Sequence, residues 1–230
     1  MSTPARQTQP ISPILARGTA LFQVIAGRSP IGMTFSIASG AQARVGRMEG
    51  EISLSEDDEV SPVHATVSSR AGQVVIADNN SLNGVYVRVR EPVALDDGDM
   101  FRVGAQLFRF DLLSVADAYP TPDGTQIFTS PRLKGSYRVL QILRDGLPGL
   151  SSSSSTDELS IGVEGARVNF TADTYLSRMH AKIIRAADGA AFLHDLGSTN
   201  GTWVRVRGDR SVRHGDQLLV GNTVLQASVH

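Results

Sequence analysis

The chain is an internal duplication, and this constrains its fold more than any other feature of the sequence. Residues 61–65 (Ser-Pro-Val-His-Ala) return as residues 177–181 (Ser-Arg-Met-His-Ala). Residues 81–84 (Ser-Leu-Asn-Gly) return as residues 198–201 (Ser-Thr-Asn-Gly), at a spacing only one residue longer. Because matches in the same order at a nearly constant spacing rarely arise by chance, the sequence predicts two copies of one module.

Each copy has the residue pattern of short β-strands. Small or β-branched residues alternate with large aromatic or basic ones along residues 85–90, and residues 202–207 repeat this alternation. A period of two is typical of a strand with one buried face. An Asn-Gly pair precedes each of these strands and marks a tight turn. Many short strands separated by turns predict an all-β chain of two β-sandwiches, each of about a hundred residues. The arginines on the outer face of these strands are expected to be solvated: Arg88, Arg90, Arg205 and Arg207.

The repeat also sets the expected domain organisation. We predict a flexible N-terminal tail at residues 1–17, a first module at 18–114, a linker at 115–132 and a second module at 133–230. The linker is polar and contains several prolines, a composition that favours a semi-rigid connector. The Ser/Thr run at 151–156 is expected to be an exposed loop within the second module.

Composition argues against several classes of protein. The chain carries 22 Lys and Arg against 23 Asp and Glu, a net charge of -1, which disfavours binding to nucleic acid through general phosphate neutralisation. There is no Cys for a disulfide or a thiolate metal site. No apolar run reaches the ~18 residues that cross a bilayer, and the polar N-terminus lacks the apolar stretch of a secretory signal. A cytoplasmic protein with no metal, no cofactor, no membrane partner and no nucleic-acid partner is therefore expected.

The common signatures of catalysis are missing from the sequence. It contains no HExxH element, no Gly-x-Ser-x-Gly element and no Walker-type phosphate loop. Its His residues also lack the close spacing of metal ligands. We expect a protein that is not an enzyme.

The repeated motifs resemble those of the forkhead-associated (FHA) domain. That pattern is a Gly-Arg pair, then Ser-x-x-His, then a Ser-Thr-Asn-Gly-like turn that leads into a strand. The first copy has Gly46-Arg47, Ser61 with His64, and residues 81–84; the second has Gly162, residues 177–180 and residues 197–202. The resemblance covers most of the chain. It implies two β-sandwiches of about eleven strands each, whose loops at one end bind phosphothreonine peptides.

The resemblance assigns roles to residues of the first copy. A phosphate offers nearly two negative charges and three acceptor oxygens, which suit an Arg fork, a hydroxyl and backbone donors. Arg47 would supply the guanidinium, Ser61 the hydroxyl, and Asn83 would hold the peptide main chain. His64 would brace the loops from behind without touching phosphate. The residues expected to give structural support in the two copies are Gly46, His64, Gly84, Gly162, His180 and Gly201.

Each copy departs from the family pattern in a different way. In the first, Pro62 stands where the family often has a second Arg, and Leu82 replaces the usual Thr. In the second, Val163 occupies the position of the Gly-Arg arginine, and Arg167 lies close enough in sequence to reach in. The second copy keeps four candidate ligands: Ser177, Arg178, Thr199 and Asn200. We therefore expect the first copy to be the main phosphopeptide site and the second to be degenerate.

Two functional hypotheses follow. One is a phosphothreonine-reading signalling adaptor of bacterial type, which acts downstream of a Ser/Thr kinase and binds the kinase or its phosphorylated target. The other is a tandem scaffold that binds partners, or itself, without phosphate. The acidic run at residues 56–59 is expected to be a solvated loop beside the first site, where it could select basic flanks on a ligand. A phosphorylated threonine of the tail or linker could also mediate self-association: Thr3, Thr8, Thr121, Thr125 or Thr129.

Overall fold

The computed structural model describes residues 18–113, 122–125, 128, 135–154 and 156–230. The predicted tail and most of the predicted linker lie outside these residues. The described parts are built of β-strands, apart from one 3-10 turn at Arg144–Gly146. They include no helix long and apolar enough to cross a membrane.

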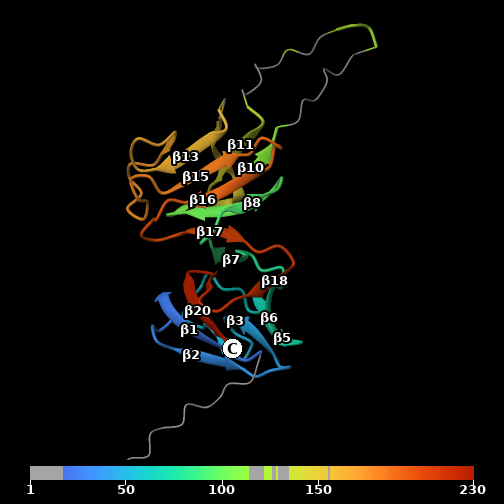
Figure 1. Ribbon diagram of the computed structural model, residues 1–230, viewed down its shortest axis with the longest axis vertical. Helices are drawn as coiled ribbons and strands as arrows, with labels where there is room; N and C mark the ends of the chain where they lie inside the picture. The colour runs from blue at the N-terminus through green and yellow to red at the C-terminus, as the bar shows by residue number, and fades with distance from the viewer. Residues whose placement is uncertain (1–17, 114–121, 126–127, 129–134, 155) are drawn as a thin grey trace, which may run out of the picture.

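One long sheet runs through the whole molecule (Figure 1). Its ten strands are hydrogen-bonded side by side, and neighbouring strands are antiparallel. In spatial order they are β12 (Pro148–Ser153), β11 (Tyr137–Ile142), β10 (Gln106–Leu112), β9 (Met100–Val103), β17 (Thr202–Arg205), β7 (Val85–Arg88), β19 (Gln217–Val220), β20 (Thr223–Val229), β1 (Ala20–Gly27) and β2 (Thr34–Ile37).

Two five-stranded sheets complete the two sandwiches, one on each half of the long sheet. The first sheet consists of β18 (Asp209–Val212), β6 (Gln73–Asp78), β5 (Ala65–Arg70), β3 (Gln42–Gly46) and β4 (Ile52–Ser53). The second consists of β14 (Val168–Asn169), β13 (Glu158–Gly162), β15 (Ala181–Arg185), β16 (Ala191–Asp195) and β8 (Val93–Leu95). The predicted all-β fold of two sandwiches is thereby confirmed.

The two repeats exchange their last three strands. The first sandwich combines β1–β7 with β18–β20, and the second combines β11–β17 with β8–β10. In Figure 1, β8 accordingly lies beside β16, and β18 lies beside β6. Each sandwich has ten strands within the described residues, close to the expected number. The predicted bounds 18–114 and 133–230 delimit the sequence repeats, whereas each sandwich takes strands from both repeats.

The exchange occurs because the strand after each Asn-Gly turn does not fold back. Val85 and Val87 are buried in the first core, but Val89, on the same face of the same extended segment, is buried in the second. The Val89 N–H donates to the carbonyl of Thr202, and the equivalent Val206 N–H donates to the carbonyl of Val85, both at 2.8 Å. Each segment therefore passes from one core into the other while keeping its alternation of buried and outward residues.

Both cores draw on both repeats. The first core packs Phe22 and Ile76 of the first repeat against Leu218 and Leu225 of the second, and all four are almost fully buried. The second core contains Phe101, Phe108 and Phe110 from the first repeat. Burying a side chain of this size contributes about 1.5–3 kcal/mol. A repeat on its own would lose this contribution unless its last three strands packed back onto its own sandwich.

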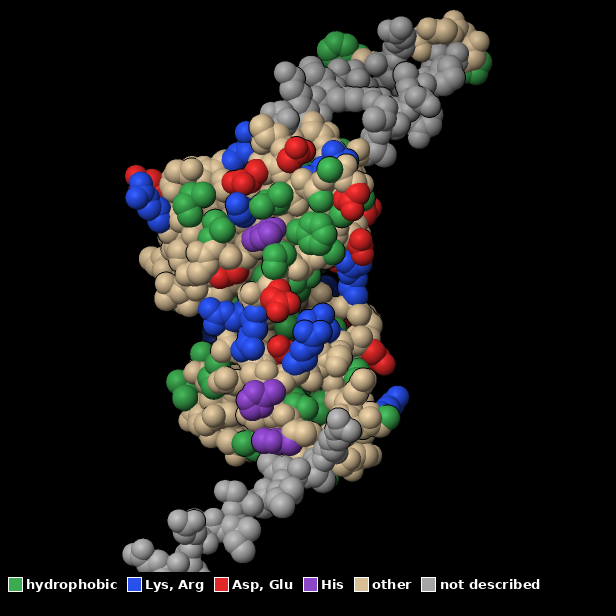
Figure 2. Space-filling model, viewed as in Figure 1, with side chains coloured by type: hydrophobic (Ala, Val, Ile, Leu, Met, Phe, Trp, Pro, Cys, Tyr) green, Lys and Arg blue, Asp and Glu red, His purple; other side chains and the backbone are tan. Residues whose placement is uncertain are grey.

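The outward arginines of the crossing segments form the predicted solvated face only in part: Arg90 and Arg207 are exposed, whereas Arg88 and Arg205 are half-buried. They contact the opposite repeat at the waist between the sandwiches, where basic side chains gather on the face shown in Figure 2. Arg88 Nη1 donates to Gln217 Oε1 at 2.9 Å, and Arg205 Nη2 lies 3.7 Å from a carboxylate oxygen of Asp78. Their partners come from the other repeat because the strands are exchanged, which the alternation alone does not reveal.

The two remaining arginines of this set also have partners across the exchange. Arg207 pairs with Asp96, 2.9 Å away, and with Asp99. Arg90 donates to the carbonyl of Gly215. All four arginines thus connect one repeat to the other.

The prediction of an exposed loop at 151–156 is wrong for the first half of this segment. Ser151, Ser152 and Ser153 belong to β12, which pairs antiparallel with β11. A serine-rich segment can form an edge strand when backbone partners are present, because the ladder uses main-chain groups that every residue carries.

Engineered disulfides test the exchange directly, because the chain has no cysteine of its own. Ala94 lies directly opposite Phe192 in the β8–β16 pair, and Val75 of β6 is the equivalent of Phe192 in the first repeat. We predict that the double variant Ala94→Cys/Phe192→Cys closes a disulfide within one chain, because directly opposed strand residues lie within disulfide range.

The matched control is Ala94→Cys/Val75→Cys, which would close only if each repeat kept its own strands. Non-reducing electrophoresis and peptide mass spectrometry of the monomer distinguish the two. Efficient closure of the control pair, with none in the first pair, would show that the strands are not exchanged.

Candidate functional site

The three residues expected to form the first site are brought together by loops at one end of the first sandwich. Arg47 follows β3, and its backbone N–H donates to the carbonyl of Ser61 at 3.0 Å. Its side-chain Nε donates to the carbonyl of Val60 at 3.1 Å. The terminal nitrogens of the guanidinium have no hydrogen-bond or ion-pair partner among the described residues.

Ser61 and Asn83 tie the neighbouring loops to each other. The Ser61 hydroxyl oxygen accepts the N–H of Leu82 at 3.1 Å, which leaves its own hydrogen free to donate. Asn83 Nδ2 donates to the carbonyl of Glu59 at 2.7 Å. The side chain of Asn83 is exposed and its amide oxygen has no partner among the described residues. The loops therefore present a guanidinium end, a hydroxyl and an amide at one surface.

His64 lies behind these loops and is completely buried. The Ser61 N–H donates to Nδ1, and Nε2 lies 3.0 Å from the carbonyl of Gly84. Nδ1 is therefore an acceptor and Nε2 carries the proton. Burial lowers the pKa of His64, although the bond to Gly84 and the charges of Asp78 and Asp57 oppose this shift. A neutral ring that joins two loops fits the predicted supporting role.

Two glycines allow the loops to approach closely. A Cβ on Gly46 would lie 2.2 Å from the carbonyl oxygen of Pro62, so no side chain fits there. Gly84 has φ +79°, and its Cβ would lie 2.3 Å from Nε of Arg205, which comes from the other repeat. The Asn-Gly turn is thus covered by an arginine of the exchanged arrangement.

The second site repeats the supporting geometry of the first. The Ser177 hydroxyl oxygen accepts the N–H of Thr199 at 3.2 Å, and Asn200 Nδ2 donates to the carbonyl of Tyr175 at 2.9 Å. His180 is completely buried and joins Ser177 N–H to the carbonyl of Gly201. Burial lowers the pKa of His180 as well, against the opposing hydrogen bond to Gly201. At Gly162, a Cβ would lie 2.1 Å from the carbonyl oxygen of Arg178.

The cationic groups of the second site differ from those of the first. Val163 packs against the second core and brings no charge to the loop. Arg178 is exposed and lies 3.5 Å from an equally exposed carboxylate of Glu164. Arg167 donates from Nε to the carbonyl of Ser153 at 3.0 Å, and no site residue is among its partners. Arg167 therefore does not take the place of the missing arginine in this structure.

A buried aspartate that the sequence reasoning missed holds each recognition loop to the other repeat. Asp57 belongs to the acidic run predicted to be solvated, yet it is completely buried. Its Oδ1 accepts the N–H of Glu59 at 3.1 Å. Its Oδ2 accepts the N–H of Asn222 at 2.8 Å and the hydroxyl of Thr223 at 2.7 Å. The loop beside the first site is therefore fixed by the β19–β20 turn of the second repeat.

Asp173 does the same in the second site. Its Oδ1 accepts the N–H of Tyr175 at 2.9 Å, and its Oδ2 accepts Ala105 N–H at 3.0 Å and Gln106 Nε2 at 2.7 Å. Asp57 and Asp173 occupy equivalent positions in the two repeats, so the alignment of the copies could have identified them. It could not have shown that their partners come from the opposite copy.

A second pair of equivalent aspartates shapes the Asn-Gly turns. Asp78 accepts the hydroxyl of Ser81 at 2.5 Å, and Asp195 accepts that of Ser198 at 2.5 Å. Burial would raise the pKa of Asp195, but hydrogen bonds from Ser198 and Thr202 outweigh it and leave the pKa below its usual value. The carboxylate is therefore charged at neutral pH and holds the turn in place.

The arrangement suits the binding of an anion by positioned donors. Arg47 and Ser61 keep free donors on neighbouring loops, and the exposed amide of Asn83 lies on the loop that contacts both Ser61 and Glu59. Within the described part of the chain, no group of three or more His, Asp or Glu side chains could hold a metal ion.

Replacing the buried aspartate tests the cross-repeat support. We predict that Asp57→Ala lowers the free energy of unfolding by about 2–4 kcal/mol, because the buried hydroxyl of Thr223 and the partly buried N–H of Asn222 lose their acceptor. Chemical denaturation measures the change.

The matched control is the next residue, Asp58, whose carboxylate forms only an exposed ion pair with Arg28 at 3.2 Å. Asp58→Ala should change stability by no more than about 0.5 kcal/mol. Equal stability of the two variants would contradict the supporting role of Asp57.

Comparison with known proteins places these loops in a family. The family model described as the FHA domain matches residues 43–104 and 159–221, together more than half of the chain. Both matched regions include the Gly-Arg or Gly-Val position, the Ser-x-x-His segment and the Asn-Gly turn.

Individual relatives match a smaller part of the chain. The transcriptional regulatory proteins EmbR of Mycobacterium tuberculosis and Mycobacterium bovis are 32% identical over 96 residues, which is 37% of this chain and 25% of theirs. The chain thus spans about a quarter of the length of these relatives.

Two solved structures are similar at low identity. The FHA domain of the CT664 protein from Chlamydia trachomatis is 22% identical, with 40% of this chain and 95% of that one covered and a TM-score of 0.24. Mycobacterium tuberculosis EmbR in complex with a low-affinity phosphopeptide is 17% identical, with 47% and 26% covered and a TM-score of 0.25. With the two matched regions and the loop geometry of both sites, the chain belongs to the FHA-domain family.

Proposed function

We propose that this protein is a phosphothreonine-peptide-binding adaptor that acts downstream of a Ser/Thr kinase, with the first site as the main reader. The observation that carries this proposal is the free donor set of the first site. The guanidinium end of Arg47 and the hydroxyl hydrogen of Ser61 have no partner among the described residues, and Asn83 is exposed beside them. A phosphate group would satisfy these donors. The protein carries out this role by binding and not by catalysis, in the cytoplasm.

The second site is proposed to read phosphate weakly. Val163 supplies no guanidinium, and Arg178 is exposed and paired with Glu164. Ser177, Thr199 and Asn200 remain available at the loop surface. The loss of one charge-assisted contact costs about 1.5–3 kcal/mol, equivalent to a roughly ten- to hundred-fold weaker complex.

The alternative is a tandem scaffold that binds partners without phosphate. The exchanged strands support the scaffold alternative, because they join the two sandwiches through a continuous sheet that needs no ligand to hold it together. The two functions differ in whether phosphorylation of the peptide changes its affinity.

Calorimetry with matched peptides tests the proposal. We predict that the whole chain binds a phosphothreonine peptide and that Arg47→Ala weakens the complex at the first site at least tenfold, because a charge-assisted contact is lost. Arg44→Ala is the matched control, since Arg44 lies on β3, which leads into Arg47, and among the described residues its guanidinium has only Glu49 as an ion-pair partner, 3.8 Å away. Equal affinity for the phosphorylated and unphosphorylated peptides would contradict the proposal and favour the scaffold.

We also propose that a phosphorylated threonine of the tail or linker docks on an FHA site of the same chain or of a second copy. Thr125 is described, and its N–H donates to Asp123 Oδ1 at 3.0 Å; Thr3, Thr8, Thr121 and Thr129 lie outside the described residues. Treatment with a Ser/Thr kinase followed by mass spectrometry should find phosphate on at least one of the five. A chain that stays unmodified at all of them would rule this out.

A further inference from the structure

A groove of about 410 Å³ lies at the waist of the molecule, next to the second site. Its floor is on the outer face of the long sheet, opposite the buried valines of β7, and consists largely of Trp203, Leu219 and Val224. Both repeats contribute to its walls. The polar and aromatic residues that line it are Arg28, Arg102, Tyr175, Asn200, Trp203 and Asn222.

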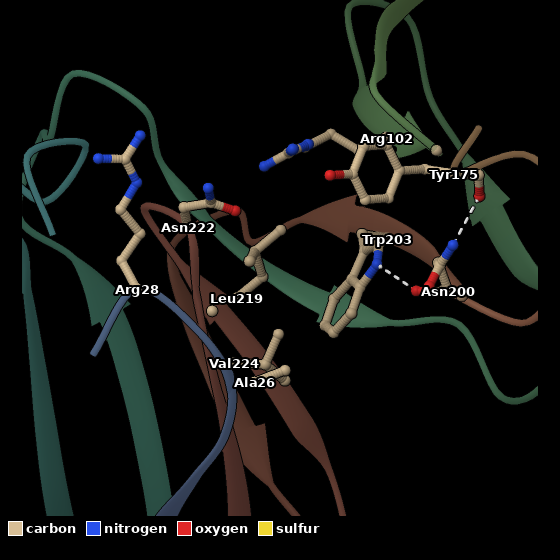
Figure 3. Close-up of a pocket in the computed structure, with 12 residues that line it drawn as sticks. Ala26, Arg28, Arg102, Tyr175, Asn200, Trp203, Leu219, Asn222 and Val224 are labelled. Carbon is tan, nitrogen blue, oxygen red and sulfur yellow. Dashed lines mark hydrogen bonds between the residues drawn. The ribbon is translucent and has the colours of Figure 1, made fainter. Parts of the chain in front are cut away.

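The two arginines face each other across this groove. In Figure 3, the side chains of Arg102 and Tyr175 both point toward Asn222, and Arg28 lies on the far side of Asn222. Arg102 has no hydrogen-bond or ion-pair partner among the described residues, although its side chain is half-buried. Arg28 forms one exposed ion pair, with Asp58 at 3.2 Å. The groove therefore has at least one uncompensated positive charge over an apolar floor.

The groove begins at a residue of the second site. Asn200, the predicted holder of the peptide main chain, donates from Nδ2 to the carbonyl of Tyr175, and its own carbonyl accepts Nε1 of Trp203 at 3.2 Å. Asn200 is thus fixed between the recognition loop and the groove floor. A peptide held at Asn200 can place a neighbouring residue in the groove.

The first site lacks the equivalents of two groups that line this groove. Leu219 occupies in the second repeat the position that Arg102 occupies in the first, and Glu59 occupies the position equivalent to Tyr175. The loop beside the first site also exposes Glu56, Asp58 and Glu59. The loop beside the first site is therefore acidic where the groove beside the second carries Arg102, and this groove is complementary to an anion.

We infer that this groove binds an anionic side chain, a carboxylate or a second phosphate, of a peptide whose phosphothreonine occupies the second site. Arg102 and Arg28 hold the anionic group, and the Tyr175 hydroxyl is placed to donate to it. The inference rests on the proposed phosphopeptide binding, and it supplies the second site with a cationic contact that Val163 does not provide. The second site then selects peptides with an acidic or doubly phosphorylated segment, which the first site does not favour.

Trp203 gives a direct signal for this groove, because it is the only tryptophan of the chain and lies in the groove floor. The experiment uses the full chain with Arg47→Ala, so that the first site contributes little. Its fluorescence is titrated with three peptides of the same length: phosphothreonine with neutral flanks, phosphothreonine with aspartates or a phosphoserine at successive flanking positions, and the aspartate-flanked peptide without phosphothreonine.

The decisive variant is Arg102→Leu, which introduces the residue already present at the equivalent position 219. Arg70→Leu is the control, because Arg70 is an exposed arginine at the end of β5 and does not line the groove. We expect an anionic flank to tighten binding about tenfold, as one charge-assisted contact does. Arg102→Leu should abolish this gain, and Arg70→Leu should preserve it. The aspartate and phosphoserine peptides distinguish a carboxylate ligand from a phosphate ligand.

The other outcomes separate this inference from the proposed function. If the neutral-flanked phosphothreonine peptide binds and an anionic flank adds nothing, the groove inference is overturned while phosphopeptide binding stands. The same conclusion follows if the gain survives in Arg102→Leu. If no peptide changes Trp203 fluorescence in the Arg47→Ala chain, the inference is overturned, and calorimetry on the unmodified chain decides the proposed function separately.

Discussion

The antiparallel pairing of β7 with β17 is the contact on which the rest of this structure depends. Val87 lies opposite Val204 at the middle of the long sheet, and on either side of this pair each strand leaves its own sandwich for the other. Because neither strand turns back, the three strands that follow it can complete only the opposite sandwich. The continuous sheet, the mixed cores and the arginine contacts at the waist all follow from this one pairing.

The exchange makes each recognition site depend on both repeats. At each site, the loops that carry the candidate ligands come from a single repeat. The buried aspartate of that site, Asp57 or Asp173, accepts hydrogen bonds from a turn of the other repeat. Similarly, Arg205 covers the Asn-Gly turn of the first site, and Arg88 covers that of the second. The two sites are therefore similar in framework and different in surroundings, since Tyr175 and Asn200 of the second site line the groove that contains Arg102.

The contacts among the predicted site loops could be anticipated from the sequence because they are local within a repeat. Arg47, Ser61, His64 and Asn83 lie on consecutive loops between β3 and β7, so their spacing already specifies which groups meet. It failed where a partner comes from the other repeat. Asp57 belongs to an acidic segment with the composition of a solvated loop, yet it is buried by a turn that lies far away in sequence. A different failure occurred within one repeat: the serines at 151–153 have the composition of a loop, yet they form a strand because β11 of the same repeat offers backbone partners.

The sequence alone was enough to recognise the two repeats, their β character and their family, and to predict candidate ligand residues on the loops of each site. Only the tertiary structure decided which copy completes which sandwich. The physical reason is that an alternation of buried and outward residues is satisfied equally by either of two similar cores. Val89 and Val206 fit the core of the opposite sandwich. The path of the chain between strands, which is not encoded in the alternation, therefore fixes the strand partners, the buried aspartates and the groove beside the second site.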